Sequence, residues 1–94
     1  MTITAHNLVR HELLGLQAHV VGARDPGLVS REGTIIDESK EMFYLQTTDG
    51  VVRIPKGVCT FDIALPDGVV VRVDGQLLRG RPEDRLKRPA TRRW

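Results

Sequence analysis

Six short runs of the chain alternate apolar and polar residues with a period of two, which is the pattern of β-strands that bury one face. Each run is rich in Val, Ile, Thr or aromatic residues and is bounded by Gly, Asp or Pro. The runs are Leu16–Ala23, Gly33–Asp37, Met42–Thr47, Val51–Pro55, Thr60–Leu65 and Val69–Asp74. The pattern therefore predicts a small sheet of about six strands.

The alternation also predicts which side chains face the core. The inward set is Phe43, Leu45, Val52, Ile54, Phe61, Ile63, Leu65, Val69, Val71 and Val73, and the outward set is Tyr44, Arg53, Asp62 and Arg72. The segments Thr48–Gly50 and Pro66–Gly68 place Gly where a tight hairpin requires a positive φ, so neighbouring strands are expected to be antiparallel. Short antiparallel strands without crossover helices expose their edges unless the sheet curls. We therefore expect a mostly β fold, built as a small antiparallel barrel.

Short helices are expected at both ends of the sheet. Thr4 is placed to cap a helix over Asn7–Leu13, and Gly15 is placed to end it. That helix has a narrow apolar stripe that must pack on something, and another protein is one candidate. Pro82–Arg85 begins a second helix, with Pro at the first position and acidic residues in the first turn. One domain then comprises an N-terminal helical extension at 1–15, a barrel at 16–78, and a basic C-terminal helix and tail at 79–94.

The positive charge of the chain is concentrated at its C-terminal end. The 94 residues carry a net charge of +2, but residues 1–78 hold seven basic and ten acidic residues, whereas residues 79–94 hold seven basic and two acidic ones. Six of the seven basic tail residues are arginines, whose planar guanidinium groups match phosphate oxygens. Nucleic acid is therefore one interpretation, and a merely solvated terminus is the other. Among cations in the strand region, Arg53, Lys56 and Arg72 are expected to join the tail.

The residues that could perform catalysis or bind a metal form no recognisable motif. The candidates are His6, His11, His19, Glu12, Asp37 and Glu38. His6 and His11 are five residues apart, which is not the i, i+4 spacing of a helical zinc site. Asp37–Lys40 is interpreted as a charged turn that shapes a hairpin. We therefore expect no catalytic residue, no metal ligand and no bound cofactor in this chain.

Cysteine content and hydropathy bear on the cellular compartment. Cys59 is the only cysteine, so it cannot form an internal disulfide, and it is expected to be a small buried apolar residue. No stretch of about 18 apolar residues is present. We expect a cytoplasmic protein that makes no contact with membranes.

Six segments form a recognisable ordered set: Glu12–Leu16, Gly33–Ser39, Ile54–Lys56, Cys59–Phe61, Val73–Gly75 and Arg79–Arg85. In this order they resemble the Sm-like protein subunit of archaeal ribonuclease P, known as protein component 1. Ser39 stands where that family usually has Thr, a change that keeps the hydroxyl group. The resemblance implies an Sm-like or SH3-like barrel that binds the RNA of ribonuclease P. That RNA, with magnesium, would remove the 5′ leader of precursor tRNA, so the chain would belong to an endonuclease, a hydrolase, without being catalytic.

The resemblance also implies roles for individual residues. Together with the charge argument, it gives the expected RNA-binding set Arg53, Lys56, Arg72, Arg79, Arg81, Arg85, Lys87 and Arg88. The N-terminal helix would contact the zinc-ribbon subunit of the enzyme through Leu8, His11, Glu12 and Leu14. Precursor tRNA would be an indirect partner of this chain.

Small barrels host many functions, so the fold alone leaves alternatives open. One is an Sm-like or SH3-like module that binds protein partners, and another is a ribosomal-type RNA-binding protein in a different complex. A third is a free-standing metal-dependent nuclease. Co-purification separates the first two from a ribonuclease P subunit, and chelator-sensitive RNA cleavage by the isolated chain would identify the third.

Overall fold

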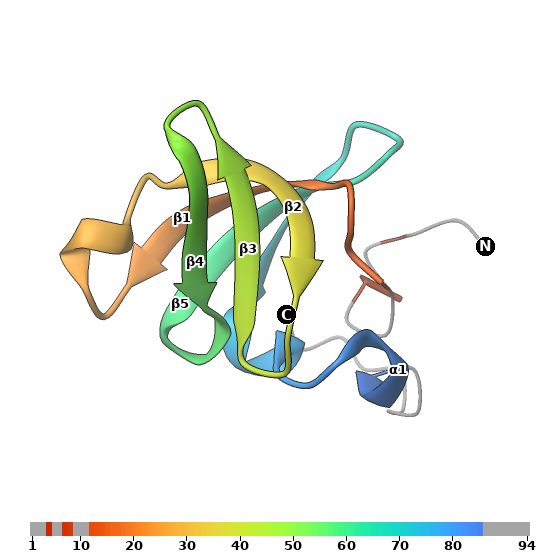
Figure 1. Cartoon of the computed structure of the whole chain (residues 1–94). Helices are drawn as coiled ribbons and strands as arrows, with labels where there is room; N and C mark the ends of the chain where they lie inside the picture. The colour runs from red at the N-terminus through yellow and green to blue at the C-terminus, as the bar shows by residue number, and fades with distance from the viewer. Residues whose placement is uncertain (1–3, 5–6, 9–11, 86–94) are drawn as a thin grey trace.

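A computed structural model describes residues 4, 7–8 and 12–85, which form one antiparallel sheet with short helical turns between and after its strands (Figure 1). The strands are β1 (Gln17–Ala23), β2 (Glu32–Glu38), β3 (Met42–Thr47), β4 (Gly50–Pro55), β5 (Cys59–Ala64) and β6 (Val70–Asp74). The helical turns are η2 (Pro26–Leu28), η3 (Lys56–Val58), η4 (Gly75–Leu78) and α1 (Pro82–Arg85). The six predicted strands are confirmed, and their ends lie within one residue of the predicted ones.

The sheet has the linear strand order β4-β3-β2-β1-β5-β6, and each neighbouring pair is antiparallel. Bulges in β1, between Val20 and Gly22, and in β2, between Ile35 and Asp37, bend the strands around one core (Figure 1). The prediction of a closed barrel is not confirmed, because no ladder joins β4 to β6 within the described residues. Pro55, which lacks an N–H group, ends β4, and η3 follows it directly.

Glycine shapes the sheet at its turns and at one close crossing. Gly50 and Gly68 have φ values of +117° and +89°, which confirms the two predicted hairpin turns. A Cβ atom at Gly33 would lie 2.3 Å from the carbonyl oxygen of Gln46, so β2 and β3 approach each other closely only because a glycine stands there.

The core lies inside the curved sheet and contains the predicted inward residues of β3, β5 and β6. Phe43 and Phe61 meet edge to face, with ring centroids 5.3 Å apart, at its centre. Val69 is a correction, because it is 49% exposed rather than buried. It precedes β6 and belongs to the hairpin turn, where its N–H donates to the Asp67 carboxylate and its carbonyl accepts from Leu65.

The segment before β1 packs onto the core. Leu8 and Leu13 are fully buried there. Thr4 and Asn7 exchange hydrogen bonds, and Gly15 has a φ of +88°, consistent with the predicted start and end of a helix. Residues 9–11 of that predicted helix lie outside the described residues, so the helix stays a prediction. In the described part of the chain, no helix is long and apolar enough to cross a membrane.

Candidate nucleic-acid interface

A buried cluster of three charged side chains lies where η3 and α1 meet the end of β2. The Glu38 carboxylate accepts bonds from Lys56 Nζ at 2.5 Å and from Arg85 Nη1 and Nη2 at 2.8 and 3.0 Å. The side chains of Lys56 and Arg85 are fully buried, and that of Glu38 is 2% exposed. The end of β2 is therefore tied to both η3 and α1 by ion pairs that are shielded from solvent.

The cluster contains two cations and one carboxylate, and main-chain carbonyl groups stabilise the excess positive charge. Lys56 Nζ donates to the carbonyl oxygens of Ser39 at 2.8 Å and Gly80 at 3.0 Å, and Arg85 Nη1 donates to the same Gly80 oxygen at 2.8 Å. Lys56 Nζ also lies 4.7 Å from the centroid of the Phe43 ring. Burial lowers the pKa of Lys56, while its hydrogen bond to Glu38 raises it.

Lys56 and Arg85 are both predicted to contact RNA, but the Lys56 ammonium and the Arg85 guanidinium are buried in this structure. The interpretation of Asp37–Lys40 as only a charged turn missed Glu38. The bulge between Ile35 and Asp37 explains why. One extra residue reverses the in-and-out alternation, so Glu38 turns inward where simple alternation places it outward.

The backbone around the cluster requires a glycine beside Lys56. A Cβ atom at Gly75 would lie 1.8 Å from the Lys56 carbonyl oxygen and 2.6 Å from that of Cys59. Cys59 is buried, as predicted, and burial raises the pKa of its thiol. Residues 56–59 and 75–78 therefore pack backbone against backbone.

Arg79 lies at the surface next to this cluster. Its guanidinium donates to both Glu41 carboxylate oxygens, from Nε at 2.8 Å and Nη2 at 3.2 Å, and the two side chains are 48% and 46% exposed. This hydrogen bond holds the pKa of Glu41 below its usual value. Arg79 Nη1 also donates to Gln76, whose amide donates to the carbonyl oxygen of Gly57.

A polar hollow of about 430 Å³ continues this surface toward the end of β1. Arg24, Gly57 and Gln76 line it, and the Arg24 N–H donates to the Val58 carbonyl oxygen at 3.0 Å. The Arg24 side chain is exposed and makes no hydrogen bond or ion pair within the described residues. The sequence does not single out Arg24, because the segment after β1 carries a turn signal at Asp25–Gly27 but no motif for RNA binding.

Two predicted RNA-binding residues, Arg53 and Arg81, are exposed, and their side chains likewise have no partner in the described part of the chain. Arg72 differs from them. It is exposed on β6 but donates to both carboxylate oxygens of Asp62 on β5, at 2.9 and 3.1 Å. Lys87 and Arg88 lie outside the described residues.

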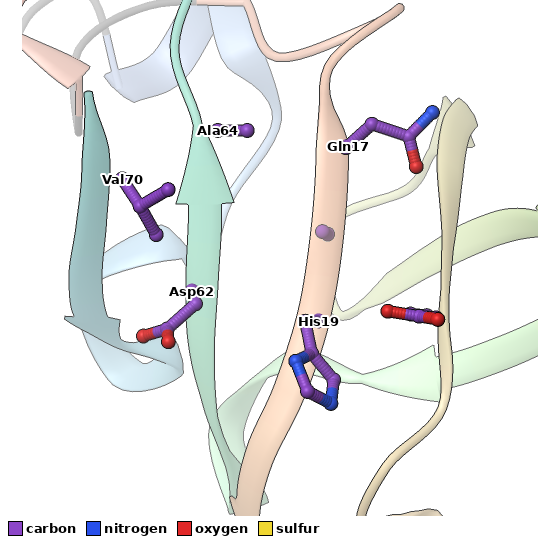
Figure 2. A pocket seen from close by; sticks show the side chains of 7 residues that line it. Gln17, His19, Asp62, Ala64 and Val70 are labelled. Atoms are coloured by element: carbon purple, nitrogen blue, oxygen red, sulfur yellow. The ribbon is translucent and has the colours of Figure 1, made fainter. Parts of the chain in front are cut away.

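His19 and Asp62 flank a second, smaller hollow of about 190 Å³ on the outer face of the sheet (Figure 2). Its lining comes from the strands β1, β2, β5 and β6, and Figure 2 shows Gln17, Ala64 and Val70 beside these two residues. The described residues contain no group of three or more His, Cys, Asp or Glu side chains that could hold a metal ion.

The predicted partner-binding residues are separated by the fold. Leu8, which is predicted to contact the partner, is fully buried in the core of this chain. Glu12 is exposed, and Leu14 is 44% exposed. Ile36, which is 47% exposed, lies on β2 next to the segment that follows Leu14, because Gly15 N–H donates to the Ile35 carbonyl oxygen at 2.8 Å. His11 lies outside the described residues.

Comparison with known proteins identifies relatives of this chain. The family model described as ribonuclease P/MRP, subunit p29, matches residues 6–88. The chain belongs to this family. The p29 family match includes each strand of the sheet, the ion cluster and the start of the basic segment.

Several relatives of this chain carry the name ribonuclease P protein component 1. The one from Pyrococcus abyssi is 40% identical over 98% of this chain and 71% of its own length. The one from Methanocaldococcus jannaschii is 42% identical over 92% of this chain and 90% of its own length. A solved structure, described as Mth11, a homologue of human RNase P protein Rpp29, is 31% identical with a TM-score of 0.59. It covers 79% of this chain and 96% of its own.

Proposed function

We propose that this chain, as a protein subunit of ribonuclease P, binds the RNA of that enzyme in the cytoplasm and stabilises its active fold. The observation that carries the proposal is the family match across residues 6–88. The RNA, assisted by Mg²⁺, would hydrolyse the phosphodiester bond that releases the 5′ leader of precursor tRNA. The chain itself binds no cofactor in this proposal and supplies no reacting group.

The proposed RNA-binding surface comprises the helical turns η3 and η4 at one end of the sheet. It continues into the basic C-terminal segment. Arg79, Arg81 and Arg24 supply its exposed positive charge in the described residues. Lys87 and Arg88 extend it in the sequence. Arg79 is available although Glu41 binds it, because a half-exposed ion pair contributes little and phosphate oxygens compete for the same donors.

The role of this surface is to neutralise phosphate groups. Each contact releases counterions from the RNA, so affinity falls steeply as the salt concentration rises. Phosphate contacts fix position and carry no direct sequence information, so the subunit recognises the shape of the folded RNA. Only Tyr44, Phe43 and Phe61 are aromatic in the described residues, and both phenylalanines are buried, which leaves little capacity for base stacking.

We also propose that the zinc-ribbon subunit of ribonuclease P contacts the side of the sheet around β2. Leu14 and Ile36 are exposed apolar residues on adjacent segments, and Glu12, two residues before Leu14, is exposed and charged. Exposed apolar side chains gathered next to polar ones are typical of protein interfaces. This surface includes none of the arginines proposed to bind RNA, so both partners could bind at once.

Reconstitution tests the proposal. Ribonuclease P RNA is assayed for cleavage of precursor tRNA at low magnesium, with the partner proteins and with or without this chain. We expect cleavage to depend on adding the chain, and added magnesium to replace part of that dependence. Equal cleavage without the chain, together with no binding of the chain to that RNA, would reject the proposal.

A further inference from the structure

We propose that Arg85 is a positioning residue: by inserting into the fold and binding Glu38, it fixes the start of the basic segment so that the cations after it engage RNA together. This inference rests on the proposed RNA-binding function. It gives Arg85 a role other than direct phosphate contact, and it gives an acidic residue, Glu38, a favourable role in binding a polyanion.

The geometry excludes a phosphate contact by Arg85 in this structure. The side chain is fully buried, and its two terminal nitrogens bind both oxygens of the Glu38 carboxylate. Nη1 also donates to the carbonyl oxygens of Leu78 and Gly80, at 3.0 and 2.8 Å. A guanidinium with this many partners would have to leave them all before it could bind RNA.

The whole segment from Arg79 to Arg85 is attached to one short part of the chain, the β2–β3 turn with its flanking residues. Arg79 binds Glu41, and the Gly80 N–H donates to the Lys40 carbonyl oxygen at 2.7 Å. Arg85 binds Glu38. Three successive attachments, to Glu41, Lys40 and Glu38, therefore hold the backbone before the tail against the sheet.

Gly80 is the point at which these attachments meet. Its φ is +98°, a conformation that glycine adopts without strain. This turn directs its N–H to Lys40 and its carbonyl oxygen to both Lys56 and Arg85. The same glycine thus joins the ion cluster to the β2–β3 turn.

Fixing the chain at Arg85 affects the cations that follow it in the sequence, which are Lys87, Arg88, Arg92 and Arg93. The first of them is two residues away. A segment whose start is fixed loses less conformational entropy on binding, and its charges have a higher effective concentration near a surface that already carries Arg79 and Arg81. Releasing the anchor would therefore weaken several phosphate contacts at once.

The test compares two full-length variants with the same charge change. Arg85→Leu removes the anchor and leaves Glu38 and Lys56 as a neutral pair, whereas Arg81→Leu removes an exposed arginine. Affinity for ribonuclease P RNA is measured over a range of salt concentrations. Arg81→Leu is expected to reduce the slope of log affinity against log salt by about 0.7–0.9, the value of one contact. Arg85→Leu is expected to reduce it by at least about 1.5, the value of two contacts or more.

A merely structural role would not produce this result, because partial unfolding lowers the fraction of active protein without changing the slope. Equal slopes for the two variants would overturn the proposal. If Arg85→Leu does not fold, Arg85→Lys replaces it, because lysine keeps the charge and loses the two-pronged bond to Glu38. We then expect weaker RNA binding at unchanged charge, and wild-type affinity for Arg85→Lys would also overturn the proposal.

Hydrogen exchange across residues 79–85 in the free protein separates this inference from the proposed function. Faster exchange in Arg85→Leu than in Arg81→Leu supports anchoring whether or not RNA binds. Unchanged exchange overturns anchoring. Failure of the wild-type chain to bind ribonuclease P RNA rejects the proposed function instead.

Discussion

Glu38 and Arg85 are 47 positions apart in the sequence, and their side chains form a two-pronged ion pair in the interior of the protein. The pair joins the last residue of β2 to the last residue of α1. Lys56 binds the same carboxylate, so the charge of Glu38 compensates cations from two separate segments.

Removing the carboxylate of Glu38 should strongly destabilise the fold. Glu38→Gln leaves Lys56 and Arg85 buried without a counter-charge, and breaking a buried ion pair in this way costs about 3–5 kcal/mol. Urea denaturation followed by circular dichroism measures the loss. Glu41→Gln is the matched control, because Glu41 is half exposed and its loss should change stability little. Similar midpoints for the two variants would contradict the prediction.

Gly75→Ala should be among the most damaging single-methyl changes in this chain. The added Cβ would lie 1.8 Å from the Lys56 carbonyl oxygen, so the backbone of η3 or η4 must shift, at a cost of about 3 kcal/mol or more. Gly57→Ala is the control, since its Cβ would meet mainly the flexible side chain of Arg79, at 3.2 Å. Thermal unfolding compares the two. A melting temperature for Gly75→Ala equal to that of Gly57→Ala would argue against backbone contact between the two turns.

Stability in acid should depend on the pair formed by Asp62 and Arg72. The hydrogen bond from Arg72 lowers the pKa of Asp62 below its ordinary value of 3.8. A lowered folded-state pKa means that the pair stabilises the fold fully above the unfolded-state pKa and loses this effect as the pH falls through the folded-state pKa. Melting temperatures at stepwise lower pH, from about pH 5 to pH 2, should therefore fall more in the wild type than in Asp62→Asn. Asp49→Asn, in an exposed hairpin turn, should follow the wild type.

Arg24 should contribute to RNA binding although no sequence motif marks it. Its side chain is exposed beside the polar hollow that leads to Arg79. Arg24→Ala is expected to reduce the salt slope of binding to ribonuclease P RNA by about 0.7–0.9. Arg72→Ala is the control, because Arg72 lies on β6, outside the proposed surface of η3, η4 and the basic segment. If Arg72→Ala reduces the salt slope more than Arg24→Ala does, the interface lies instead on the outer face of the sheet around β6.

Leu14→Ser should weaken binding of the zinc-ribbon subunit without weakening the fold. Leu14 is 44% exposed, so its polar replacement removes apolar contact area mainly in the complex. Calorimetric titration with the partner, together with a melting curve of the free chain, measures both effects. Val51→Ser, on the edge strand β4, is the control and should leave partner affinity unchanged. Equal loss for both variants would indicate a different interface.

The strands and most of the core could be predicted from the sequence because a period of two depends only on neighbouring residues. Phe43, Phe61 and Ile63 are buried as that period requires. Glu38 was missed because a bulge breaks the period, and no local pattern marks where a strand will bulge. The pattern also could not predict whether the sheet closes into a barrel, since closure depends on whether β4 and β6 pair.

The candidate site was predicted by charge, and charge alone does not distinguish an exposed cation from a buried one. Arg81 and Arg85 are four residues apart in the same basic segment, yet one is exposed and the other is fully buried. What separates them is Glu38, whose inward direction is set in a distant part of the chain. Predicting the burial of Arg85 therefore requires the tertiary structure.

The central place of β1 in the sheet has a consequence for the order in which the protein forms as it is synthesised. The strands β2, β3 and β4 add to one side of β1 as each is made, but the other side pairs with β5, which begins only at Cys59. A nascent chain that has not reached this residue exposes an open edge of its first strand. Pairings between distant segments form slowly, and unpaired edges promote aggregation. Until residues 59–64 have been synthesised, this edge of β1 therefore lacks the strand that covers it in the folded protein.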